Sequence, residues 1–159
     1  MAPPFTRIAA ITGANKGIGL AIVRNLALQY PSSAFNSGPL LIYLTARDQG
    51  RGEEAVKSLQ NDAQLKKARA LVGDGGLSEI RYHGLDISKP KSIIDFATFL
   101  QEEHPEGIDM VVNNAGIAME GFGTSIFHAA QHPSLAGGLT GMQISMSSTK
   151  HFNVTTTAL

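Results

Sequence analysis

Short apolar runs alternate along the chain with longer stretches in which apolar residues recur at helical spacing. Strands are predicted at 6–11, 40–45, 80–86 and 108–112. Helices are predicted between them at 17–29, at 51–70, and from Ser88, as the capping residue, to about Leu100. Strands that alternate with helices pair in parallel through right-handed crossovers. The predicted fold is therefore a three-layer α/β fold with a doubly wound parallel sheet, which stops after about the fourth strand.

The chain changes character after Gly116. Residues 117–159 are rich in glycine, serine and threonine, and their pattern predicts no convincing strand. We therefore divide the chain into a sheet-forming region, 1–119, and an irregular or partly helical tail, 120–159. If the fourth strand is the last one, it forms an exposed sheet edge through which copies of the chain could associate.

Charge and composition exclude several classes of partner. Thirteen lysines and arginines balance thirteen acidic residues, which argues against nucleic acid or an anionic membrane as a partner. In the charged stretch 51–70, Glu53 precedes Lys57 by four residues, the favourable order for an ion pair on a helix that faces water. The sequence has no cysteine, and no apolar run of signal-peptide or membrane-spanning length. We therefore expect a cytoplasmic protein without disulfides.

A glycine-rich turn, TGANKGIG at 12–19, lies between the first predicted strand and the first predicted helix. Backbone amides and the helix dipole at such a junction favour the binding of a pyrophosphate. Gly13 would permit the tight turn, Gly17 would let phosphates approach the backbone, and Gly19 would let the helix pack close to the sheet. The alternative is a glycine-rich loop that binds no ligand.

Two cations lie where a dinucleotide would carry a 2′-phosphate. Arg47 follows the second strand, at the place where an arginine accepts the 2′-phosphate of NADPH and an acidic residue binds the ribose of NADH. Lys16, within the glycine-rich turn, can supply a second positive charge. Asp48 could instead bind the ribose of NADH. Taken alone, Lys16 or Arg47 could as well be a solvated surface residue as a phosphate ligand. The pair favours NADPH over NADH.

Polar residues also follow the third and fourth strands. Asp86 can accept a hydrogen bond from the adenine amino group while Ile87 packs on the ring, although Asp86 alone is more typical of a turn before a helix. The segment Asn113-Asn114-Ala115-Gly116 can lie beside the adenosine ribose and join neighbouring strands. Paired asparagines after a strand are, however, usually turn formers.

Together these four segments resemble the short-chain dehydrogenase/reductase family, over residues 6–119. The Ala-Asn-Lys of the first turn and the Thr-Ala-Arg after the second strand are similar to NADPH-dependent carbonyl reductases, which transfer a hydride to ketones, aldehydes and quinones. The resemblance implies a Rossmann-type fold and NADPH as cofactor. It implies a cofactor site at Gly13, Asn15, Lys16, Gly17, Ile18, Gly19, Arg47, Asp86, Ile87, Asn114, Ala115 and Gly116.

Family catalysis uses a Tyr-x-x-x-Lys pair and a serine. The tyrosines of this chain are Tyr30, Tyr43 and Tyr82, and the residues four further on are alanine, arginine and aspartate. We therefore expect the chain to end before the catalytic residues and before the family's fifth to seventh strands, and a small carbonyl substrate only in a complete homologue. Asn153 is a candidate for the asparagine that family members carry on the helix after the fourth strand.

Other residues that could do chemistry lack the partners it requires. His128 and His132 are four residues apart, but Pro133 and a weak helical pattern argue against a metal site. The serines within 145–148 have no identified base. Three functions therefore stay open: a truncated carbonyl reductase, a non-catalytic module that binds NADPH, and a non-functional product that does not fold stably.

Overall fold

The structure is a computed structural model that describes residues 5–116 and 144–146. Its strands are β1 (Arg7–Ile11), β2 (Leu40–Ala46), β3 (Ser78–Gly84), β4 (Met110–Val112) and β5 (Ile144–Met146). They form one sheet in the order β3-β2-β1-β4-β5. The first four strands are parallel, and β5 pairs with β4 in the antiparallel direction.

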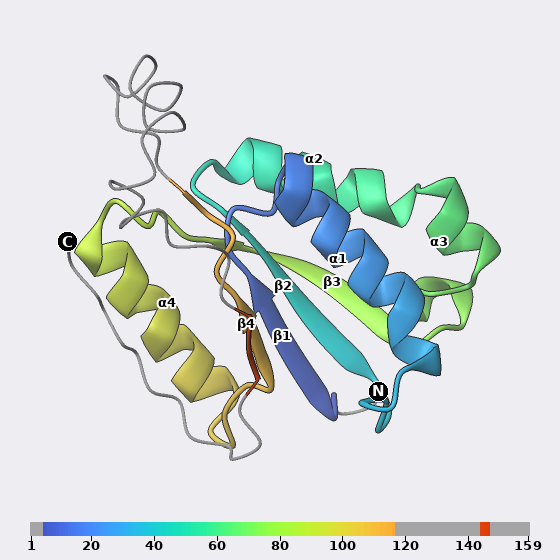
Figure 1. Cartoon of the computed structure of the whole chain (residues 1–159). Helices are drawn as coiled ribbons and strands as arrows, with labels where there is room; N and C mark the ends of the chain where they lie inside the picture. Colours follow the sequence, from blue (N-terminus) through green and yellow to red (C-terminus); the bar gives the residue numbers. More distant parts are fainter. Residues whose placement is uncertain (1–4, 117–143, 147–159) are drawn as a thin grey trace, which may run out of the picture.

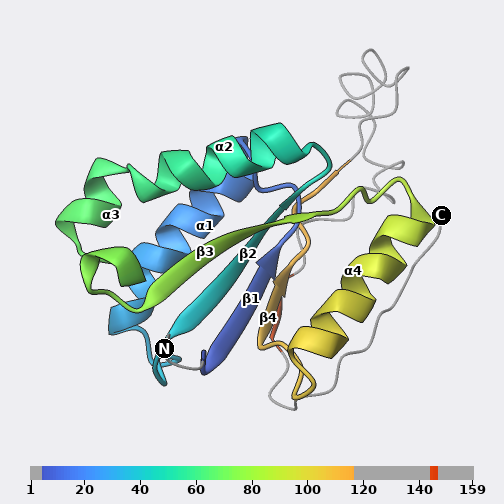
Figure 2. The same ribbon diagram turned by 180° about the vertical axis from the view of Figure 1, so that it is seen from behind.

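Helices cover both faces of this sheet, as the doubly wound fold requires (Figure 1). The helices of one face are α1 (Gly17–Gln29), α2 (Gln49–Gln60) and α3 (Ala63–Lys67). On the other face lies α4 (Pro90–Glu103), which Figure 2 shows from behind. Two short 3-10 turns follow α1 and α3, η1 (Tyr30–Ser32) and η2 (Val72–Asp74). No helix in the described part of the chain is long and apolar enough to cross a membrane. The predicted α/β fold is confirmed.

The core has two parts because successive strand residues point to opposite faces. Ile11 and Leu44 pack under the helices α1 to α3, whereas Leu41 and Tyr43 face α4. All seven residues of β2 are buried. A central parallel strand is covered on both sides, which is why the sequence shows a continuous apolar run there and no alternation.

The helix predicted over 51–70 is two amphipathic helices. Asp62 interrupts it, because its side chain accepts hydrogen bonds from the backbone N–H groups of Gln64 and Leu65 and so caps α3. Aspartate favours this cap position over a helix interior. The expectation that the segment faces water was also wrong on one side, since apolar residues of both helices are buried: Ala55, Val56, Leu59 and Leu65.

The start of α4 also differs from the prediction. Ser88 does not cap this helix, which begins at Pro90 with Lys89 at the cap position. Proline suits the first helical position because its ring fixes φ and it has no N–H to satisfy, which moves the cap and the start of the helix one residue along. Ser88 instead donates a hydrogen bond from its hydroxyl to Asp86 Oδ1 (2.6 Å).

The strand β5 was not predicted, and β4 is therefore not the edge of the sheet. Met110 pairs with Met146 and Val112 pairs with Ile144. An unpaired strand edge offers N–H and C=O groups that bond any extended segment whatever its side chains, so composition is a poor guide there. The other residues of the predicted tail, including Asn153, lie outside the described residues.

Candidate functional site

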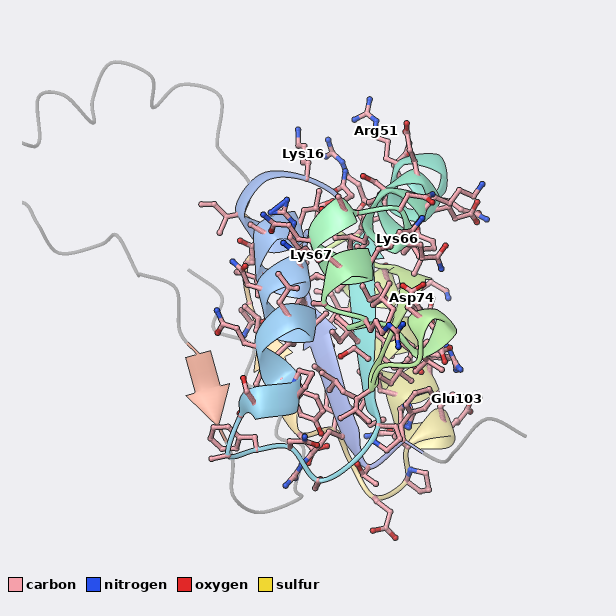
Figure 3. All side chains as sticks on the ribbon, turned by 90° about the vertical axis from the view of Figure 1, so that its right-hand side faces the viewer. Lys16, Arg51, Lys66, Lys67, Asp74 and Glu103 are labelled. Carbon is pink, nitrogen blue, oxygen red and sulfur yellow. The ribbon has the colours of Figure 1, made fainter. Side chains whose placement is uncertain are left out.

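The predicted site residues gather at one edge of the sheet, where the four parallel strands end. The chain passes from β1 to β2 and β3 on one side of β1, and then crosses back so that β4 lies on the other side of β1. The turn after β1 therefore lies at the topological switch point, where ligands bind in open α/β sheets. Lys16 and Arg51 project from this end of the molecule, away from the end at which α4 finishes with Glu103 (Figure 3).

The backbone of the turn requires glycine at two positions. Gly13 has a φ of 62° and Gly17 a φ of 57°, in the left-handed region that other residues rarely adopt. A Cβ on Gly13 would lie 2.9 Å from Ala115 Cα, so this glycine also lets β1 and β4 approach. A Cβ on Gly19 would lie 2.5 Å from the carbonyl oxygen of Gly13. Gly13 and Gly19 thus each permit a close backbone approach, whereas within the described residues a Cβ on Gly17 would meet no atom within 4 Å.

The amino end of α1 differs from those of the next two helices. Lys16 occupies its cap position without a side-chain hydrogen bond. By contrast, Asp48 caps α2 and Asp62 caps α3 with their carboxylates. Within the described part of the chain, the first N–H groups of α1 therefore have no side-chain acceptor at the cap. Such donors, at the positive end of the helix dipole, suit an anion.

Thr12 and Asn114 join the turn after β1 to the turn after β4. Thr12 Oγ1 accepts hydrogen bonds from the backbone N–H groups of Asn114 (3.0 Å) and Ala115 (2.9 Å). Asn114 Nδ2 donates to the carbonyl oxygens of Thr12 (3.0 Å) and Gly13 (3.1 Å). The sequence predicted that an asparagine here joins strands, but it missed Thr12. The signal was a hydroxyl at the end of a buried strand, which needs a partner.

Thr45 joins the same turn to β2 on its other side. The Thr45 hydroxyl donates a hydrogen bond to the carbonyl oxygen of Ile11 (3.1 Å). The Thr45 carbonyl oxygen accepts a hydrogen bond from the backbone N–H of Ala14 (2.8 Å). Thr45 is fully buried, and sequence analysis did not single it out. The turn is therefore held from both neighbouring strands.

Two exposed cations stand beside this fixed turn. Lys16 lies within the turn, and Arg47 follows β2 directly. Within the described residues, neither side chain forms an ion pair. Asp48, the residue that could favour NADH, uses Oδ1 to accept from the backbone N–H of Arg51 (2.8 Å). The edge thus presents positive charge.

Asp86 forms the turn that leads from β3 toward α4. Its Oδ1 accepts from the hydroxyl (2.6 Å) and the backbone N–H (3.1 Å) of Ser88, and its Oδ2 lies 3.5 Å from Lys89 Nζ. These hydrogen bonds, chiefly the one from the Ser88 hydroxyl, lower the pKa of Asp86. Ile87 is half-buried against the apolar cluster under α4. The turn interpretation of Asp86 is therefore observed, and its contact with adenine stays a prediction.

Comparison with known proteins gives these features a family context. A family model described as short chain dehydrogenase matches residues 7–148. Carbonyl reductase (NADPH) 1 of Rattus norvegicus is 39% identical over 136 residues, and carbonyl reductase (NADPH) 3 of the same species is 42% identical over 113 residues. These matches span 86% and 71% of this chain but 41% and 32% of the two relatives. The chain therefore covers less than half of their length.

Solved structures show the same fold. L-sorbose reductase from Gluconobacter frateurii, solved with NADPH and L-sorbose, is 25% identical, with a TM-score of 0.51 over 72% of this chain and 35% of that one. Menthone neomenthol reductase from Mentha piperita is 23% identical, with a TM-score of 0.53 over 89% of this chain and 47% of that one. The second likeness concerns the fold alone.

Proposed function

The chain belongs to the short-chain dehydrogenase family, and from this membership we propose that it binds NADPH at the carboxyl edge of its sheet. The observation that carries the proposal is that an uncapped helix amino end and two cations, Lys16 and Arg47, lie at this one edge, and neither cation has an ion-pair partner among the described residues. A pyrophosphate and a 2′-phosphate need donors and charges of these kinds. The similar rat proteins are named as carbonyl reductases that use NADPH.

The turn at 12–19 is suited to hold the pyrophosphate. Among the residues that the structure describes, no atom lies within 4 Å of the place where a Cβ on the left-handed Gly17 would be, and no cap side chain accepts from the first N–H groups of α1. Hydrogen bonds from β2 and β4 fix the turn before any ligand arrives. A preformed site of this kind loses less conformational entropy on binding.

The charges near the end of β2 support NADPH over NADH. Arg47 is exposed and can bind a 2′-phosphate through two parallel N–H donors, and Lys16 adds a point charge. Asp48 is the residue that would favour NADH, but capping α2 already occupies one of its carboxylate oxygens. On this proposal Asp86 accepts from the adenine amino group through Oδ2, and Asn114 to Gly116 line the ribose.

We further propose that these 159 residues bind NADPH without reducing a carbonyl compound on their own. Bound NADPH supplies a hydride for the reduction of a ketone, aldehyde or quinone in enzymes of the carbonyl reductase type. The family's proton donor is the tyrosine of a Tyr-x-x-x-Lys pair, and this sequence contains no such pair. The chain's own residues then bind and orient the dinucleotide, and carbonyl reduction requires residues outside this sequence.

Thermal unfolding of the purified chain with increasing NADPH, and separately with NADH, tests the proposal. A ligand at about 100 times its dissociation constant stabilises the native state by about 2.7 kcal/mol. We expect a cooperative transition that rises with NADPH and much less with NADH. A transition that responds to neither nucleotide would reject NADPH binding. Steady oxidation of NADPH by the chain in the presence of a quinone would reject the non-catalytic part of the proposal.

A further inference from the structure

The hydroxyl of Tyr82 lies where two turns of the site meet. It donates a hydrogen bond to the carbonyl oxygen of Ala46 (3.2 Å), and the backbone N–H of Leu85 donates to the same oxygen (3.0 Å). Ala46 directly precedes Arg47, and Leu85 directly precedes Asp86. One carbonyl oxygen with two donors therefore connects the turn after β2 to the turn after β3.

The ring of Tyr82 also supports the first turn of α2. Tyr82 is register partner to Leu44, so its ring lies on the face that α2 covers. It stands against Gly52, where a Cβ would overlap the ring. The backbone N–H of Gly52 donates to the carbonyl oxygen of Asp48 (3.0 Å) and closes the first turn of the helix. The ring thus sets how closely α2 approaches the sheet just after Arg47.

The Tyr82 hydroxyl keeps its proton in this position and therefore remains a hydrogen-bond donor. Burial raises the pKa of Tyr82, and the charges of Asp48 and Glu53 raise it further. The phenol therefore keeps its proton throughout the neutral range and donates to Ala46. The side chain is half-buried.

We propose that Tyr82 is a positioning residue for recognition of the 2′-phosphate: its hydroxyl holds the peptide between Ala46 and Arg47 so that the guanidinium is ready for the phosphate. This inference rests on the proposed function. Without the hydroxyl, Ala46 keeps the hydrogen bond from Leu85, so the sheet retains its register while the segment before Arg47 gains freedom. Binding must then restrict that freedom, and the affinity for NADPH falls.

The variant Tyr82→Phe keeps the ring against Gly52 and removes the hydroxyl alone. Loss of one net hydrogen bond implies that the dissociation constant for NADPH rises roughly threefold to tenfold. NADH has no 2′-phosphate, so its constant should change less than about twofold. The matched control is Tyr43→Phe, which removes the hydroxyl bonded to His104 Nε2 (2.9 Å) on the opposite face of the sheet. It should leave both constants unchanged.

A double-mutant cycle separates positioning from general loosening. In an Arg47→Gln background, Tyr82→Phe should cause no further loss of NADPH affinity, because the guanidinium that it positions is gone. An equal loss in that background, equal losses for NADPH and NADH, or the absence of a cooperative unfolding transition in Tyr82→Phe would each overturn the inference. Failure of the wild-type chain to bind NADPH would instead reject the proposed function, and this inference with it, before any variant is compared.

Discussion

Thr12 and Asn114 are 102 positions apart in the sequence, and each hydrogen-bonds the other's backbone. Thr12 Oγ1 accepts from the N–H of Asn114, and the carbonyl oxygen of Thr12 accepts from Asn114 Nδ2, both at 3.0 Å. The two turns that flank the switch point are therefore one unit. Its geometry is set by long-range contacts and not by the glycine-rich segment alone.

We expect Thr12→Val to lower the free energy of unfolding by about 1–2 kcal/mol, the usual cost of removing one partner of a buried hydrogen bond. The shape of the side chain is nearly kept, but the N–H of Ala115 loses its acceptor. Urea unfolding of the two chains measures the difference. The control is Thr6→Val, at an exposed threonine that donates to Pro39, where a change within about 0.5 kcal/mol is expected. Equal effects at the two positions would contradict a special role for Thr12.

The close approach at Gly19 gives a second prediction. In Gly19→Ala the new methyl group would meet the carbonyl oxygen of Gly13 at 2.5 Å and Ala14 Cα at 2.8 Å, both backbone atoms that cannot turn away. Overpacking of this kind costs about 1–3 kcal/mol. The control is Gly50→Ala in the first turn of α2, where the one described atom within 4 Å of the methyl group is Asp48 Oδ1, at 3.6 Å. Alanine there should stabilise by up to about 1 kcal/mol. Thermal unfolding of both variants decides whether the prediction holds.

Most of the fold could be predicted because its central strands are buried on both faces. β1 and β2 stand out as continuous apolar runs, and the prediction of α1 at 17–29 matches Gly17–Gln29. The fourth strand is shorter than predicted, because the Asp109 carboxylate accepts hydrogen bonds from the Arg7 guanidinium (2.6 Å) and from the backbone N–H of Ile8 (2.9 Å). Local pattern does not reveal such a contact across 102 residues.

The site was less accessible to sequence reasoning, because much of it is held by backbone and hydroxyl contacts. The glycines and cations of the turn could be named from residue type and position. Thr12, Thr45 and Tyr82 could not, since each acts through a partner far away in the sequence. A polar atom at the end of a buried strand indicates that some partner exists, but only the fold identifies it.

His104 should make stability fall in mildly acidic solution. It caps the carboxyl end of α4, and its Nε2 shares a hydrogen bond with the Tyr43 hydroxyl (2.9 Å). Burial lowers the pKa of His104, and Arg81 lowers it further, while Glu103 opposes the shift. The folded chain therefore takes up this proton less readily than the unfolded chain. Stability is full above the ordinary histidine pKa of about 6.5 and declines below it until the folded His104 titrates.

Unfolding in urea at about pH 7.5 and about pH 5.5 measures this decline. The variant His104→Gln should show a smaller difference between the two conditions than the wild-type chain. The matched variant His83→Phe removes another imidazole, keeps a ring beside Phe96 and Phe99, and should retain the decline. Asp62 and Asp86 do not account for it, because their pKa values are lowered and their contributions are lost in more acidic solution. An undiminished decline in His104→Gln would contradict the assignment.

The charge of Arg47 gives the sharpest test of cofactor choice. Arg47→Asp replaces two N–H donors by a carboxylate that repels a 2′-phosphate, so the dissociation constant for NADPH should rise roughly 10- to 100-fold. NADH lacks that phosphate, and a carboxylate after the second strand can accept from its ribose, so its affinity should change little or improve. The control is Lys57→Asp, the same change of charge at an exposed position near the carboxyl end of α2. It should alter NADPH affinity less than about twofold, because charges separated by more than a Debye length are screened. If Arg47→Asp weakened both nucleotides equally, Arg47 would act on the shared part of the cofactor and the preference for NADPH would need another source.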